Sequence, residues 1–109
     1  MKSYTDIEQS KTLAKILPIE SADMCYCMVS QSLTDKFQPK LIAVPPKYSE
    51  DIPAWSLAAL LTVYPMVVGR DMDMYCCWQN SKNLHSRHYD NPIDACIEMI
   101  IKLKEKGLI

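Results

Sequence analysis

The chain has 109 residues, of which 49% are hydrophobic and 23% are charged, and its 12 lysines and arginines nearly balance its 13 aspartates and glutamates. This composition is typical of a globular domain and excludes a disordered or low-complexity chain. The formal net charge of −1 also excludes a dominant electrostatic attraction to nucleic acid or to anionic lipid. We therefore expect one folded domain over residues 1–109.

The N-terminal residues, the apolar runs and the cysteines together indicate a cytoplasmic protein. Residues 1–10 are polar and mixed in charge, so they lack the apolar stretch of a secretory signal. Apolar runs such as residues 57–61 are far shorter than the roughly 20 residues of a membrane span. The five cysteines, an odd number, are expected to stay thiols in this compartment.

Local signals predict the order helix-strand-strand-helix-strand-strand-helix. In chain order, the predicted elements are a helix over residues 6–17, strands over 24–30 and 40–44, a helix over 53–64, strands over 72–79 and 84–89, and a helix that begins at Pro92 and ends just before Gly107. A polar loop is expected over 31–39 and a short hairpin turn over 80–83. The fold class is therefore α+β, with a mostly antiparallel sheet packed against helices in a single domain.

Capping patterns set the starts of the first two helices. Thr5 and Glu8 have the spacing of a capping box, and Asp51 with Pro53 predicts the N-cap and first turn of the second helix. This second helix carries Trp55 and is apolar on nearly every side, so we expect it to be buried.

Side-chain alternation describes the strands. Residues 24–30 are apolar on both faces, which is typical of a central strand. Residues 72–79 alternate with a period of two and have one apolar face, Met72, Met74, Cys76 and Trp78. Residues 84–89 are polar on both faces, which places them at a sheet edge.

The last helix has the clearest signals, with Asn91 as N-cap, Pro92 in the first turn and Gly107 just after the end. Its apolar side chains cover more than one face, and with the other apolar elements they exceed what a small monomer readily covers. We therefore expect a two-fold homodimer, in which Ile101→Glu tests a contact through this helix. The alternative is that the last two helices pack on opposite faces of one sheet and leave no surplus.

The pairs Asp23-Met24 and Asp73-Met74 each begin a strand-strand-helix unit, which raises the question of an internal duplication. Because the identities are few and the spacings differ, two unrelated hairpins are the favoured interpretation.

Two segments, IPAWSLAALL at residues 52–61 and NPIDACIEMIIKL at residues 91–103, carry a resemblance. Together they resemble a family of small uncharacterised proteins encoded in prophage and conjugative-element regions of gut bacteria. The start of the chain, between Glu8 and Met24, is similar to that family as well. The resemblance implies a mobile-element setting, and it implies no activity and no catalytic residue.

Cys25 and Cys27 lie on the same side of their predicted strand, with Cα atoms about 6.5–7 Å apart, so both sulfurs can reach one metal ion. Their spacing lacks the two intervening residues of a zinc knuckle. Cys76 and Cys77 face opposite sides of their predicted strand, so at most one of them can join Cys25 and Cys27 as a third ligand. Cys76 is the candidate. We expect buried cysteines that pack as small hydrophobes, with no metal and no cofactor, and keep zinc as the alternative.

His85, Arg87, His88, Tyr89 and Asp90 form the densest cluster of chemically capable side chains. On a regular strand the two histidines project to opposite faces, so their spacing works against a shared site. An exposed edge hairpin is the favoured interpretation. Nucleophilic pairing of a cysteine with either histidine stays geometrically open.

Nucleotide and nucleic-acid sites have weak support. Only two glycines are present, which excludes phosphate-loop and dinucleotide fingerprints. The candidate nucleic-acid contacts are Arg70, Lys82 and Arg87 near Tyr75 and Trp78, and three lysines in the last helix, which the helix dipole favours in any case. We do not expect nucleic acid or a membrane to be the partner.

The sequence thus predicts a non-catalytic accessory or protein-interaction module of a mobile element, because no acid, base and nucleophile converge. The partner is a second copy or another protein. The alternatives are a small metal- or thiol-dependent enzyme, which uses Cys25, Cys27 or Cys76 with His85 or His88, and a weak nucleic-acid-binding protein.

Overall fold

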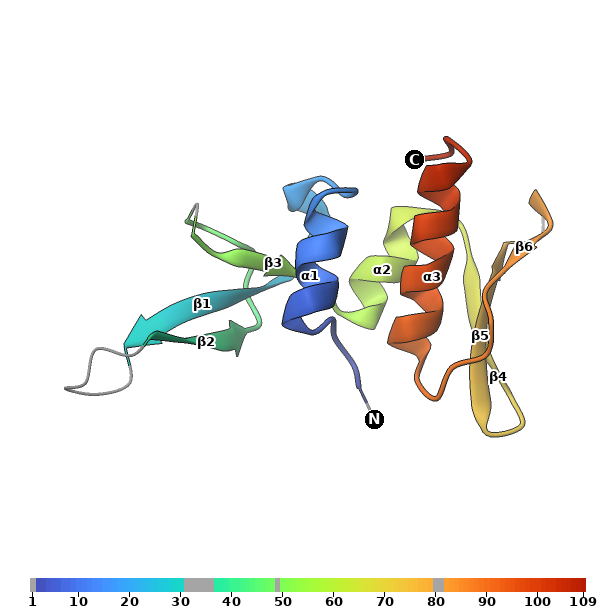
Figure 1. The fold of residues 1–109 in the computed structure, drawn as a ribbon, viewed down its shortest axis with the longest axis horizontal. Coiled ribbons are helices and arrows are strands. Elements are labelled where there is room, and N and C mark those ends of the chain that lie inside the picture. The colour runs from blue at the N-terminus through green and yellow to red at the C-terminus, as the bar shows by residue number, and fades with distance from the viewer. Residues whose placement is uncertain (1, 31–36, 49, 80–81) are drawn as a thin grey trace.

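The structure, a computed structural model, describes residues 2–30, 37–48, 50–79 and 82–109. Its elements are α1 (Ile7–Ala14), the 3₁₀ helix η1 (Ile19–Ser21), β1 (Met24–Ser30), β2 (Phe37–Ile42), β3 (Ile52–Ala54), α2 (Leu57–Val63), β4 (Val67–Asp71), β5 (Met74–Gln79), β6 (Leu84–His85) and α3 (Pro92–Glu105). Two antiparallel three-stranded sheets lie on either side of the helices (Figure 1). The α+β class and the packing of antiparallel strands against helices are confirmed.

In the first sheet the strand order is β2-β1-β3, so the predicted bounds and central position of β1 are confirmed. The prediction for its partner is wrong, because β2 begins at Phe37 inside the predicted polar loop. Register explains the difference: β1 and β2 pair without a break from Cys25↔Ile42 to Ser30↔Phe37. The remainder of the predicted loop, residues 31–36, lies outside the described residues.

The predicted helix over residues 53–64 is also corrected, because its first part is a strand. Ile52–Ala54 pairs with β1 as β3, and Pro53 fits there because an edge strand tolerates a residue without an N–H. α2 begins only at Leu57, after Ser56, whose Oγ accepts from the Ala59 N–H at 3.2 Å. Trp55 therefore lies between β3 and α2 rather than on the helix, and it is fully buried.

The capping box of α1 lies one residue later than predicted. The Gln9 N–H donates to Asp6 Oδ1 at 2.8 Å, and the Asp6 N–H donates to Gln9 Oε1 at 3.1 Å. Thr5 does not cap, because its buried hydroxyl accepts from the Trp55 N–H at 3.1 Å and lies 2.7 Å from Ser10 Oγ. The helix also ends earlier, at Ala14 instead of residue 17.

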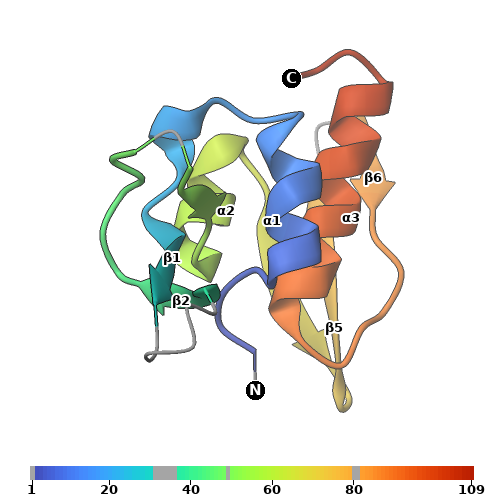
Figure 2. The ribbon, with the colours of Figure 1, turned by 60° about the vertical axis from the view of Figure 1, so that its left-hand side comes forward.

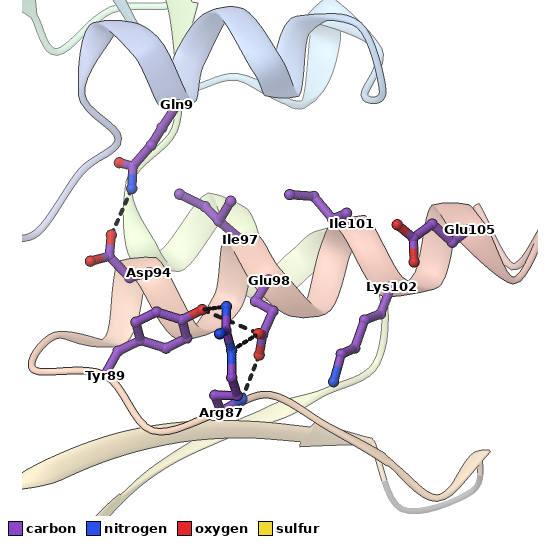
Figure 3. A pocket seen from close by; sticks show the side chains of 9 residues that line it. All are labelled: Gln9, Arg87, Tyr89, Asp94, Ile97, Glu98, Ile101, Lys102 and Glu105. Carbon is purple, nitrogen blue, oxygen red and sulfur yellow. Dashed lines mark hydrogen bonds and ion pairs between the residues drawn. The ribbon is translucent and has the colours of Figure 1, made fainter.

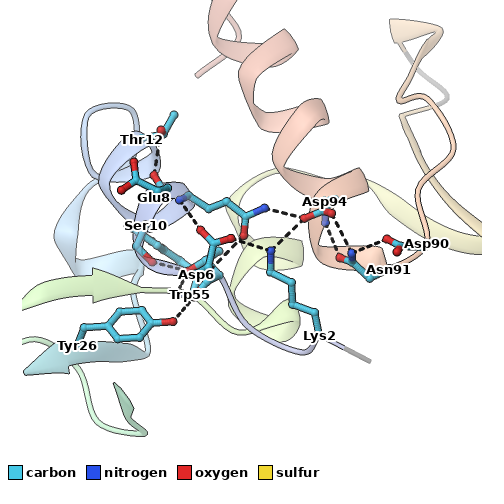
Figure 4. A network of polar contacts seen from close by, with 12 residues as sticks. Lys2, Asp6, Glu8, Ser10, Thr12, Tyr26, Trp55, Asp90, Asn91 and Asp94 are labelled. Atoms are coloured by element: carbon cyan, nitrogen blue, oxygen red, sulfur yellow. Dashed lines mark hydrogen bonds and ion pairs between the residues drawn. The ribbon is translucent and has the colours of Figure 1, made fainter. Parts of the chain in front are cut away.

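Polar contacts join the N-terminal segment and α1 to the first turn of α3 (Figure 4). Asp94 Oδ1 accepts from Lys2 Nζ at 3.2 Å and from Gln9 Nε2 at 2.6 Å. Asn91 caps α3 as predicted, since its Oδ1 accepts from the Asp94 N–H at 2.9 Å. These contacts hold α1 against the start of α3.

The second sheet has the order β4-β5-β6, and β4 was not predicted. β5 begins at Met74 rather than at residue 72, because Met72 and Asp73 form the two-residue turn that follows β4. Met72 has φ 59°, the left-handed backbone that such hairpin turns use. β6 lies at the edge, as predicted for residues 84–89, but spans only Leu84–His85. The predicted turn over 80–83 falls partly outside the described residues.

A β-bulge follows β6. Trp78 pairs with His85 and Tyr75 pairs with Tyr89, so two residues of β5 lie opposite the three residues 86–88. One extra residue reverses the alternation of side chains. The expectation that His85 and His88 project to opposite faces is therefore wrong, because the bulge returns His88 to the face of His85.

α3 lies between the other helices and the second sheet (Figures 1 and 2). Eight of its 14 residues are buried within this one chain. Gly107 follows it with φ 72°, as the sequence predicts. The fully buried core side chains include Leu13, Trp55, Leu60, Ile93, Met99, Ile100 and Leu103. None of the described helices has the length and apolarity that a membrane span requires.

Each half of the described chain has three strands followed by a helix, but the two halves are not built alike. The first strand is central in one sheet, whereas the second strand is central in the other. This difference favours unrelated hairpins over a duplicated unit.

Candidate functional site

A groove of about 410 Å³ runs along α3, between α1 and the segment that carries the bulge (Figure 3). Ile97 and Ile101 of α3 provide its apolar lining, and Gln9 lies on the α1 side. Arg87 and Tyr89 line the opposite side. Two members of the predicted cluster therefore do line the larger of the two pockets described here.

Arg87 and Glu98 in this groove form an ion pair. The Glu98 carboxylate accepts from the Arg87 backbone N–H, from Arg87 Nε at 2.7 Å and from the Tyr89 hydroxyl at 3.2 Å. Partial burial raises the pKa of Glu98, but these donors outweigh it and hold the pKa below its usual value. The arrangement is a clamp that fixes the bulge to α3, and it leaves Glu98 no role as a proton donor at neutral pH.

Because of the Glu98 clamp, the unfolding free energy should depend on pH in the acid range. A carboxylate with a depressed folded pKa stabilises the fold above its unfolded pKa of about 4.3, and this contribution is lost as the pH falls through the folded value. Glu98→Gln should therefore flatten the acid side of a plot of unfolding free energy against pH. Glu105→Gln, an exposed change on the same helix, should leave the plot unaltered. Equal behaviour of the two variants would show that Glu98 is not clamped.

The apolar face of β5 points away from α3. Cys77 on the opposite face is fully buried in the core, whereas Met74 is 38% exposed, and Val67, across from Trp78, is 51% exposed. A Cβ atom at Gly69 would lie 2.6 Å from the Trp78 ring, so this glycine lets the indole lie against β4. We call Val67, Gly69, Met74, Cys76 and Trp78 the outer sheet face.

A second pocket, of about 340 Å³, opens on this outer sheet face and brings together Cys76, His88 and Asp71. His88 Nε2 lies 3.4 Å from Asp71 Oδ2, but both side chains are more than half exposed. The Cys76 thiol donates to the Ser86 carbonyl at 3.3 Å rather than to His88. Cys76 and His88 thus line one pocket, as the predicted pairing of a cysteine with a histidine requires. They lack the hydrogen bond through which the histidine would activate the thiol as a nucleophile.

The predicted cluster at residues 85–90 is divided between the two faces of the sheet. Arg87 and Tyr89 face the groove, His88 lines the outer pocket, and His85 lies beside Trp78 by register. Asp90 accepts from the Asn91 side chain at 2.9 Å. These five residues therefore do not form one site.

Cys25 and Cys27 do come together on β1, with their Sγ atoms 3.5 Å apart. Asp51 joins them, and one ligand atom from each of the three residues lies within 4.8 Å of the others. The predicted third ligand, Cys76, is wrong for this cluster because it lies in the other sheet. Asp51 was missed because its approach to Cys27 depends on the pairing of β3 with β1.

The protonation of this Cys25/Cys27/Asp51 cluster follows from burial and hydrogen bonding. Burial raises the pKa of Cys27 to about 12, and the hydrogen bonds with Cys25 and Asp51 act in the same direction. The backbone N–H groups of Tyr48 and Lys47 lower the pKa of Asp51. At neutral pH the metal-free cluster thus holds a thiol beside a carboxylate.

Cys77 and Cys96 fit the interpretation of cysteine as a small hydrophobe. Both are fully buried in the core. The hydrogen bond with Cys96, together with burial, raises the pKa of Cys77, so this thiol stays protonated.

The candidate nucleic-acid contacts do not form one basic surface. Arg70 pairs with Asp73 at 3.2 Å and lines the outer pocket, whereas Arg87 pairs with Glu98 in the groove. Lys102 donates to the His85 carbonyl at 2.7 Å.

Comparison of the chain with family models, curated proteins and solved structures finds no match. The family that the resemblance suggests stays a prediction, and function has to be inferred from the geometry of the groove, the outer sheet face and the Cys25/Cys27/Asp51 cluster.

Proposed function

We propose that this protein is a non-catalytic interaction module that binds a second copy of itself through the outer sheet face. The observation that carries the proposal is the direction of β5: its apolar face, with Met74 and Trp78, points away from α3. Among the described elements, no helix covers this face. Apolar surface gathered on one open sheet face is typical of a contact site rather than of scattered exposed residues.

A second copy suits this face better than a charged partner. Two sheets can stack about 10 Å apart, as in a β-sandwich, so two copies related by a two-fold axis would form a helix-sheet-sheet-helix arrangement. Arg70, Asp71 and Asp73 lie around this face, so it carries both positive and negative charge. In a two-fold dimer the arginine of one copy can therefore lie opposite an aspartate of the other. The net charge of −1 gives little repulsion between copies.

The structure changes where the expected homodimer contact should lie. The sequence favours the last helix because its apolar residues extend around most of its circumference. Most of that surface is used within the chain, since α3 packs against β5 and α2. Ile101 lies partly buried in the groove and is a weaker anchor than the exposed Val67.

Two valines of equal exposure provide the test. Val67 on the outer sheet face is 51% exposed and Val44, which follows β2, is 50% exposed. Val67→Glu should convert the dimer to a folded monomer in sedimentation velocity, because it places a carboxylate in a dry contact. Val44→Glu and Ile101→Glu should leave the dimer intact. If Val67→Glu stays dimeric while either of the others dissociates, the contact lies elsewhere and the proposal fails.

A cytoplasmic location is part of this proposal. It is supported by the five free cysteines, which a reducing compartment would keep as thiols.

A further inference from the structure

The Cys25/Cys27/Asp51 cluster has the chemistry of a metal site. Alternation along β1 places the two thiols on one face, 3.5 Å apart. Because Tyr26 pairs with Ile52, Asp51, the residue just before β3, lies next to Cys27. Two adjacent strands thus bring two sulfur atoms and a carboxylate to one point.

We propose that Cys25, Cys27 and Asp51 bind a zinc ion, whose fourth position is left to water or to an incoming ligand. Zinc takes thiolate and carboxylate ligands in a tetrahedral arrangement, which with Zn–S bonds of about 2.3 Å sets the two sulfurs about 3.8 Å apart. The observed separation of 3.5 Å needs only a small adjustment. Three protein ligands leave one position of the tetrahedron open.

The ligands are held in place before any ion binds. Asp51 is 9% exposed, and its Oδ2 accepts from the backbone N–H groups of Lys47 and Tyr48, each at 3.0 Å. Such second contacts orient a metal ligand. Cys25 is 1% exposed on the central strand of its sheet, whereas Cys27 is partly exposed and gives the ion a way in.

A lysine leaves the sheet on the same face as this cluster. Lys40 pairs directly with Cys27 across β1 and β2, so its side chain leaves the same face of the sheet. Two thiolates and a carboxylate exceed the charge of a divalent ion by one, and this lysine can offset the remainder.

Titration of the reduced, metal-free protein with Zn²⁺ against a chromophoric chelator tests the proposal, with Co²⁺ as a second probe that reports thiolate ligands by its charge-transfer absorption. We expect one ion per chain, two thiolates on cobalt, and a higher melting temperature with zinc. Cys27→Ser should abolish these effects. Removal of a group that only hydrogen-bonds to a metal ligand weakens metal affinity about 10–100-fold. Asp51→Asn removes a ligand itself but keeps an oxygen that can accept from the N–H groups of Lys47 and Tyr48, so it should weaken zinc affinity by at least that factor.

Two matched controls keep the result specific to this cluster. Cys76→Ser removes a partly exposed thiol in the other sheet, and Asp73→Asn removes an exposed carboxylate, so both should bind zinc like the parent. The proposal is overturned if the reduced parent binds no zinc at micromolar concentration, if Cys27→Ser binds as well as the parent, or if Cys76→Ser loses binding equally. Formation of a Cys25–Cys27 disulfide by a protein that binds no zinc when reduced would also overturn it, in favour of a redox pair.

Discussion

Replacement of Trp55 by alanine should lower the free energy of unfolding by about 3–5 kcal/mol, the range for removal of a buried large aromatic side chain. The side chain is fully buried at the junction of β3 and α2. Its indole Nε1 donates to Ser21 Oγ at 3.0 Å, so the variant loses a polar anchor together with core volume. Such a loss is a large part of the stability of a small domain.

Urea denaturation followed by far-ultraviolet circular dichroism measures this loss. Trp78→Ala is the matched control, because Trp78 lies on the outer sheet face and is only partly buried, so its removal should cost clearly less. If the unfolding free energy of Trp55→Ala falls no more than that of Trp78→Ala, then Trp55 is not in the core and the packing described above is wrong.

Thr5→Val should have the second largest effect, about 2–4 kcal/mol, although it preserves the shape of the side chain. The buried Thr5 hydroxyl accepts from the Trp55 N–H and contacts the Ser10 hydroxyl. A valine leaves both groups in the core without this partner, and each buried unsatisfied polar group costs about 1–3 kcal/mol.

Thr12→Val provides the comparison for this variant. Thr12 lies on the exposed side of α1, and its hydroxyl only donates back to the Glu8 carbonyl. Its replacement should change the unfolding free energy by no more than about 0.5 kcal/mol, as is usual for surface positions. Equal losses in the two threonine variants would mean that the Thr5 hydroxyl does not hold the N-terminal segment to Trp55.

The elements that sequence patterns predict well are those whose signals are complete within a short segment. The capping residue, proline and glycine around α3 are all local, and so is the alternation of β1, so both elements were located correctly. β3 was missed because it is short and depends on pairing with β1, a strand elsewhere in the chain. β4 pairs with the strand that directly follows it, and it was missed because the predicted strand over 72–79 included the turn between the two. Pro53 is compatible with both a helix start and an edge strand, and only the partner strand decides between them.

The candidate sites divide in the same way. That Cys25 and Cys27 share a face follows from alternation alone, whereas the addition of Asp51 depends on the register of β3. The bulge after β6 is likewise a matter of register, and it placed His88 on the face opposite to the one expected. For β5 the period-two pattern identified the apolar face correctly, but periodicity does not say which side α3 will cover.

Light scattering of the unmodified protein over a concentration series tests the central claim most directly. The outer sheet face predicts a mass that rises to about twice the 12.5 kDa of one chain, and the same series with Val67→Glu should stay at the single-chain mass. A mass of one chain at every concentration of the unmodified protein would contradict self-association through this face.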